Sequence, residues 1–206
     1  MPDLRAALTS CPIVAILRGV APDEIDAIGD ALVEAGVTVI EVPLNSPSPF
    51  DSIKRLAARH GTRALVGAGT VLEADDVARV ADAGGKLVVA PNFDTEVVRA
   101  AKAAGLASLP GVMTPSEGFA ALKAGADGLK LFPAEIIPPA VFKAWRAVFA
   151  ADTLLLAVGG VGVDNIKSYA QAGASGYGIG SALYKPGRSA GEIGKLARAL
   201  VVAAKA

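Results

Sequence analysis

The hydrophobic pattern of the chain switches between short apolar runs and longer stretches in which apolar residues recur at helical spacing. The short runs are nearly all apolar, which is typical of strands buried on both faces. Strands are predicted at residues 13–17, 38–42, 64–66, 87–90, 107–109, 128–131, 154–158 and 176–179. Helices are predicted at residues 22–34, 48–59, 73–83, 94–103, 116–124, 139–149, 163–170 and 190–204. Strand and helix therefore alternate through eight units.

Residues at the helix ends support the same pattern. Thr114 and Glu117 have the spacing of a capping box at a helix start. Five helical patterns end in an Ala-Gly pair, with glycines at positions 36, 84, 105, 125 and 173. Glycine allows the left-handed backbone that commonly ends a helix. The repeat of helix, Ala-Gly turn and strand is typical of parallel βα folds.

Eight βα units predict a closed barrel. The competing architecture is an open, doubly wound sheet, which would carry Gly-x-Gly-x-x-Gly after the first strand. The sequence there is Arg18-Gly19-Val20-Ala21-Pro22-Asp23, which lacks that fingerprint. We therefore predict an α/β protein that forms a single-domain (β/α)8 TIM barrel over residues 1–206.

Composition limits the classes of partner. The 20 basic and 20 acidic residues give a formal net charge of zero, which provides no long-range attraction to nucleic acid or to an anionic membrane. No apolar run approaches the roughly 20 residues that span a bilayer, and the N-terminus has no signal-peptide pattern. The single cysteine, Cys11, cannot form an internal disulfide. We therefore expect a cytoplasmic protein without a membrane or nucleic-acid partner.

The chain has few residues for a metal site or a thiol nucleophile. Cys11 is interpreted as a small residue ahead of the first strand, and the single histidine, His60, as part of a solvated, charged helix end. With one cysteine and one histidine, we expect no metal ion. Phe142, Trp145 and Phe149 lie at helical spacing, which predicts a packed helix face.

Lys130 is the most informative residue, because it lies inside an apolar strand. Burial of an unpaired ammonium lowers its pKa, and a neutral amine can attack a ketone and form an imine. The alternative is a lysine neutralised by a structural carboxylate. In a β/α barrel the functional site forms at the carboxyl ends of the strands, where this residue lies.

Other chemical groups occupy the ends of neighbouring strands. Glu41 ends the second predicted strand and could move protons in the barrel mouth, or it could be a salt-bridge partner of Lys130 or Arg18. Arg18 ends the first strand and suits binding of a carboxylate. Thr70 offers a hydroxyl at a helix start.

Glycine-containing turns follow the last two strands, where these barrels commonly bind phosphate. They are Gly159-Gly160 and Gly180-Ser181. The alternative is that the glycines only serve tight turns. Two such turns at this pair of strands favour phosphate binding.

Taken together, these motifs resemble the keto-deoxy-phospho-sugar-acid aldolases, known as the KDPG/KHG aldolase family. The resemblance runs from about residue 12 to 185. Its segments are residues 13–19 and 41–47, Gly67-Ala68-Gly69-Thr70, Ala90-Pro91-Asn92, Pro110-Gly111, Lys130-Leu131-Phe132-Pro133, Gly159-Gly160 and Gly180-Ser181. Each segment alone has little specificity, whereas their joint occurrence is highly specific.

The resemblance implies a homotrimeric, metal-independent class I aldolase that needs no cofactor. Its substrate would be a phosphorylated sugar acid, cleaved reversibly to pyruvate and glyceraldehyde 3-phosphate. Lys130 would form the imine and Glu41 would be the general acid/base. The other residues implied in substrate binding are Arg18, Gly67, Thr70 and Pro91 toward the pyruvate end, and Gly159, Gly160, Gly180 and Ser181 toward the phosphate.

Two features of the sequence indicate a branch of this family. Gluconate-type members carry Glu-x-Thr-Leu-Arg, whereas this chain has Glu41-Val42-Pro43-Leu44-Asn45. Gluconate-type members also have threonine before the Gly-Gly pair, where this chain has Val158. Both features resemble the galactonate-type branch, and Asn45 removes one partner of the substrate carboxylate. The alternatives are the gluconate epimer, or a sugar-phosphate isomerase or binding barrel.

Overall fold

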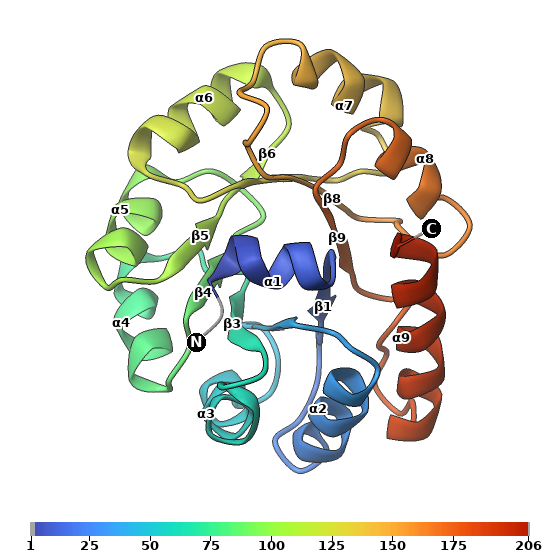
Figure 1. Ribbon diagram of the computed structural model, residues 1–206. Helices are drawn as coiled ribbons and strands as arrows, with labels where there is room; N and C mark the ends of the chain where they lie inside the picture. The colour runs from blue at the N-terminus through green and yellow to red at the C-terminus, as the bar shows by residue number, and fades with distance from the viewer. Residues whose placement is uncertain (1–2, 206) are drawn as a thin grey trace.

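A ring of parallel strands forms the centre of the molecule, and helices surround it (Figure 1). The structure is a computed structural model that describes residues 3–205. The strands are β1 (Ile13–Ile16), β2 (Val39–Pro43), β3 (Leu65–Gly69), β4 (Leu87–Val89), β5 (Ala107–Leu109), β6 (Gly111–Val112), β7 (Leu129–Leu131), β8 (Leu155–Val158) and β9 (Gly176–Ile179). The helices are α1 (Leu4–Ser10), α2 (Ile25–Glu34), α3 (Pro49–His60), α4 (Ala74–Asp82), α5 (Thr95–Ala103), α6 (Pro115–Ala124), α7 (Pro139–Arg146), α8 (Ile166–Gln171) and α9 (Ala190–Lys205).

The order of the strands shows how the ring closes. Neighbouring strands pair in the order β5-β4-β3-β2-β1-β9-β8-β7-β6. The two ends of this order, β5 and β6, are separated in the chain by Pro110 alone, a residue without the N–H that a strand pairing uses. They therefore occupy one strand position of eight. The predicted (β/α)8 TIM barrel is confirmed, and β6 is a strand segment that the hydrophobic pattern did not predict.

Side chains on each strand alternate between the barrel interior and the layer beneath the helices. The interior cluster includes Val39 of β2 and Leu156 and Val158 of β8. Glu41 lies two residues after Val39 and therefore has the same interior orientation. Lys130 lies between Leu129 and Leu131, both of which pack in the outer layer, so its side chain also enters the interior.

Helix α1 lies across one end of the barrel (Figure 1), and the sequence analysis did not predict it. Its Leu4 and Leu8 belong to the interior cluster. Asp3 caps the helix, because its side chain accepts a hydrogen bond from the backbone N–H of Ala6 at 2.7 Å. Leu8 lies against Gly176, the first residue of β9. Helix α1 therefore covers the amino ends of the strands, and the carboxyl ends are left for a site.

Most of the predicted local features are confirmed. The capping box of Thr114 and Glu117 begins α6, and all five predicted helix-ending glycines have positive φ. Phe142, Trp145 and Phe149 are buried, with Trp145 and Phe149 stacked at 4.9 Å between ring centroids. No helix within residues 3–205 has the length and apolar character to cross a membrane.

The prediction for His60 is wrong. Its side chain is buried between α2 and α3, with Nε2 3.2 Å from Oδ1 of Asp30. Gly29 of α2 makes this approach feasible, because a Cβ atom there would lie 3.0 Å from Nε2 of His60. Burial lowers the pKa of His60. His60 therefore belongs to the interface between α2 and α3, although the polar sequence around it predicted exposure to solvent.

Candidate active site

A cavity of about 620 Å³ opens at the carboxyl ends of β7, β8 and β9. It is lined by many of the predicted residues, namely Arg18, Lys130, Val158, Gly159, Gly160, Gly180 and Ser181. A small space beneath it is lined by Glu41 and Lys130 together with apolar interior residues such as Val14 and Leu109. The barrel therefore brings the predicted amine and carboxylate together below an open pocket.

Glu41 carries an isolated carboxylate inside the barrel. The residue is 1% exposed, and Oε2 has no hydrogen-bond partner among residues 3–205. Burial raises the pKa of Glu41 to about 7, against the opposing effect of the nearby Lys130 and Arg18 charges. No ion pair within the described chain joins Glu41 to either cation. Such a carboxyl group can gain or lose a proton near neutral pH, as general acid/base chemistry requires.

Lys130 is buried in the interior, where its ammonium is poorly solvated. Its residue is 5% exposed, and Nζ lies 4.8 Å from the centroid of the Phe132 ring. Burial lowers the pKa of Lys130, Arg18 lowers it further, and Glu41 raises it. The result is a larger fraction of neutral amine, the form that attacks a carbonyl carbon.

Glycines in β3 make room for this arrangement. A Cβ atom at Gly69 would overlap Oε2 and Cδ of Glu41 and would lie 2.5 Å from Oε1. Lower in the strand, a Cβ atom at Gly67 would overlap the backbone carbonyl of Leu87. Gly69 therefore provides the space for the carboxylate, whereas Gly67 permits close approach of two strands and does not line the cavity.

Arg18 is oriented by two neighbouring loops. Its Nη1 donates to Oδ1 of Asn45 at 2.7 Å and to Oγ1 of Thr70 at 3.3 Å. Thr70 has φ of 54°, a left-handed conformation that a β-branched residue rarely adopts. Strain of this kind is concentrated at functional sites. Asn45 thus contacts the arginine.

The residues of the two predicted glycine turns line the cavity. Gly159 and Gly160 both have positive φ, at 105° and 63°. Within the described chain, the N–H groups of Gly159, Gly160, Gly180 and Ser181 donate no hydrogen bond. Free N–H groups on residues that line a cavity suit an anion.

Several lining residues were not predicted from sequence. Phe132, Glu135, Tyr184 and Lys185 all line the cavity. Phe132 lies two residues after Lys130 in the same motif, and this position in the sequence could have identified it. The other three residues lie in loops with no distinguishing pattern. Pro91, which was predicted, does not line the cavity, and its carbonyl group packs against Gly111.

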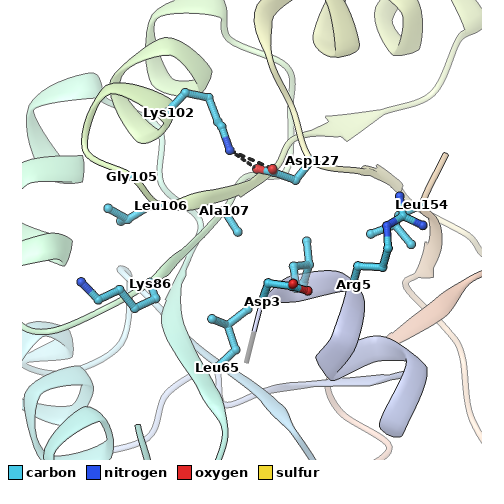
Figure 2. A pocket seen from close by; sticks show the side chains of 11 residues that line it. Asp3, Arg5, Leu65, Lys86, Lys102, Gly105, Leu106, Ala107, Asp127 and Leu154 are labelled. Atoms are coloured by element: carbon cyan, nitrogen blue, oxygen red, sulfur yellow. Dashed lines mark hydrogen bonds and ion pairs between the residues drawn. The ribbon is translucent and has the colours of Figure 1, made fainter. Parts of the chain in front are cut away.

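A second cavity, of about 530 Å³, lies at the opposite end of the barrel (Figure 2). Its walls include Leu65 at the start of β3, Lys86 just before β4, and Arg5 of α1. Lys102 and Asp127 at its edge form an ion pair at 2.7 Å (Figure 2). This cavity lies at the amino ends of the strands, where the residues of β/α barrels contribute to stability and not to catalysis.

The residues 3–205 contain no group of three or more His, Cys, Asp and Glu side chains positioned to bind a metal ion. The groups that line the mouth of the barrel and the space below it include the Lys130 amine, the Glu41 carboxyl group and the Arg18 guanidinium group.

Comparisons with known proteins agree on one family. The family model for KDPG and KHG aldolase matches residues 4–196. The chain is 47% identical over 192 residues to "Probable 2-dehydro-3-deoxy-6-phosphogalactonate aldolase" of Rhizobium meliloti, covering 93% of this chain and 91% of the relative. It is 43% identical to 2-dehydro-3-deoxy-6-phosphogalactonate aldolase of Escherichia coli, with 95% of each chain covered. A solved structure described as "Native KDPGal structure" superposes with a TM-score of 0.93 at 42% identity, covering 94% of each chain.

Proposed function

The chain belongs to the KDPG and KHG aldolase family, and from this premise we propose that it reversibly cleaves 2-dehydro-3-deoxy-6-phosphogalactonate to pyruvate and D-glyceraldehyde 3-phosphate. The observation that carries the proposal is the buried Lys130 amine beside the buried Glu41 carboxyl group, directly below an open cavity. The names of the relatives agree with this substrate.

In the proposed mechanism Lys130 is the nucleophile. Its neutral amine attacks the C2 ketone to form a carbinolamine, which loses water to give a protonated imine. Loss of the proton from the C4 hydroxyl breaks the C3–C4 bond, releases the aldehyde and leaves an enamine on Lys130. Protonation of the enamine at C3 and hydrolysis then release pyruvate and the free amine.

Glu41 moves the protons in these steps. With a pKa raised to about 7, it can donate a proton to the leaving water and accept one from the C4 hydroxyl at neutral pH. It is buried beside Lys130, so bulk water does not compete for these transfers.

The two ends of the substrate are assigned to two sets of groups. We assign the carboxylate to the Arg18 guanidinium, with Thr70 and Asn45 as its positioning partners. We assign the phosphate to the free N–H groups of Gly159, Gly160, Gly180 and Ser181. Gly67 permits the close approach of β3 and β4, and Pro91 packs against Gly111 after the end of β4.

The active assembly is proposed to be a homotrimer of single-domain barrels, located in the cytoplasm. Large apolar side chains are exposed between the end of β6 and the turn that follows α7: Met113, Phe119, Ile136 and Val148 are 48% to 61% exposed. Apolar side chains of this kind on a monomer suit an interface between subunits. Cys11 is the single cysteine and cannot form an internal disulfide, which fits a reducing compartment.

The mechanism is tested by trapping the imine. Wild-type protein incubated with pyruvate and borohydride should gain a reduced pyruvate adduct at Lys130, located by mass spectrometry of peptides. Lys130→Ala should lose the adduct and nearly all cleavage activity. Lys123→Ala, which removes an exposed lysine of α6, is the matched control and should keep both.

An adduct that persists on Lys123 or Lys143 in the Lys130→Ala protein would show that the nucleophile lies elsewhere. Absence of any adduct in the wild type would exclude a Schiff-base aldolase and favour an isomerase or a binding barrel.

A further inference from the structure

Glu135 lies in the loop between β7 and α7, and its side chain lies over the glycine turn that follows β8. A Cβ atom at Gly159 would overlap Oε2 of Glu135, and one at Gly160 would lie 2.6 Å from its Cγ and 3.2 Å from Oε1. The loop is anchored by the N–H of Ala134, which donates to the carbonyl of Val158 at 2.8 Å. The carboxylate therefore lies directly beside the proposed phosphate turn.

This carboxylate is available to a ligand. Among residues 3–205, no hydrogen bond or ion pair engages it, although it lines the cavity. The other charged side chains that line the cavity are the cations Arg18, Lys130 and Lys185. The hydroxyl of Tyr184 is already used, because it donates to Glu24 at 2.6 Å. Glu135 is thus the one carboxylate that the lining residues of the described chain present.

A carboxylate next to a phosphate site needs a hydrogen-bond donor as its partner, since two anions repel each other. An ionised carboxylate only accepts hydrogen bonds, and those it accepts are stronger than neutral ones. A sugar acid supplies hydroxyl donors. With the phosphate on C6 at the turn of Gly159 and Gly160, the nearest hydroxyl is the one on C5.

We infer that Glu135 accepts a hydrogen bond from the C5 hydroxyl and thereby selects the configuration at that carbon. C5 is the hydroxyl-bearing carbon of glyceraldehyde 3-phosphate, so the D aldehyde is favoured over the L aldehyde. The inference rests on the proposed function and assigns a specificity-determining residue to the same site.

The test measures aldol addition of pyruvate to D- and to L-glyceraldehyde 3-phosphate. The ratio of the two kcat/KM values should fall in Glu135→Ala by roughly 5–150-fold, the effect of one unpaired polar group in a binding site. Glu135→Gln keeps an acceptor oxygen and should retain part of the ratio. Glu34→Ala, which removes an exposed carboxylate of α2 that does not line the cavity, should keep the wild-type ratio.

The outcomes separate this inference from the proposed function. If wild-type protein forms the Lys130 adduct but Glu135→Ala keeps the wild-type ratio, the inference is overturned and the aldolase proposal stands. An unchanged ratio together with tighter inhibition by inorganic phosphate would make Glu135 a group that repels anions, which also overturns the inference. If the wild type forms no pyruvate adduct, both are overturned.

Discussion

Replacement of Gly69 by alanine should displace the Glu41 carboxylate while leaving Lys130 in place. The added Cβ atom would overlap Oε2 and Cδ of Glu41 and would lie 2.5 Å from Oε1, and these are its three nearest atoms. Non-bonded carbon contacts lie at about 3.5–4.0 Å. The Glu41 side chain must therefore move by more than 1 Å at its tip, on the order of the difference between these distances.

Two consequences follow from that displacement. Overpacking of a filled interior costs about 1–3 kcal/mol of stability, so the midpoint of unfolding should decrease. Loss of a positioned general acid/base should slow proton transfer by about 10²–10⁴-fold. Gly191→Ala is the matched control, because a Cβ atom at Gly191 has no neighbour within 4 Å.

The assay is exchange of the pyruvate methyl protons for deuterium, followed by proton NMR, alongside borohydride trapping. Exchange of the methyl protons requires both the imine and a base. The final yield of the borohydride-reduced adduct requires only the amine of Lys130. Gly69→Ala should lose exchange by the factor above and still yield the adduct. Exchange at the wild-type rate in a folded Gly69→Ala protein would refute the claim that the position of Glu41 controls proton transfer.

Three further predictions concern the same site. The pKa of Glu41 is raised to about 7, so its base form is lost as pH falls below that value, and proton exchange should fall about tenfold per pH unit there. The Glu41→Gln protein should exchange protons about 10²–10⁴-fold more slowly at pH 8 and lack this pH dependence. An exchange rate near that of the wild type would show that Glu41 is only a structural charge. Val158→Thr should shift the ratio of the kcat/KM values for the galactonate and gluconate substrates toward the gluconate epimer by up to about 1–3 kcal/mol, or roughly 5–150-fold, because threonine adds a hydrogen-bonding group. A wild-type protein that strongly prefers the gluconate substrate would contradict the assigned substrate. Cleavage activity should survive exhaustive treatment with EDTA, and restoration of lost activity by a divalent ion would contradict the class I mechanism.

The barrel could be predicted from the sequence because its signals are local. Short apolar runs and stretches of helical spacing each occur eight times, helix-ending glycines occur five times, and each of these signals depends on a few consecutive residues. The elements that the pattern missed lack such signals. Helix α1 is short, and its apolar residues Leu4 and Leu8 are buried only because they cover the end of the barrel. Segment β6 is two residues long and follows a proline.

Part of the site was also predictable. Lys130 was conspicuous as a charge within an apolar strand, and the glycine turns stood after the last two strands of the pattern. His60 shows the limit of such arguments. It lies in a polar sequence, yet packing of α3 against Gly29 of α2 buries it.

Residue types and their order along the chain were sufficient to predict the fold class and to single out Lys130 and the glycine turns that follow the last two strands. They could not show that Glu41 lies in the interior without an ion pair, that Arg18 is oriented by Asn45, or that Glu135 enters the cavity. These three properties depend on the registers of strands and on loops that are far apart in the chain. Whether a charge is solvated, paired or isolated is set by the side chains around it in space, and those neighbours are assembled only when the barrel closes.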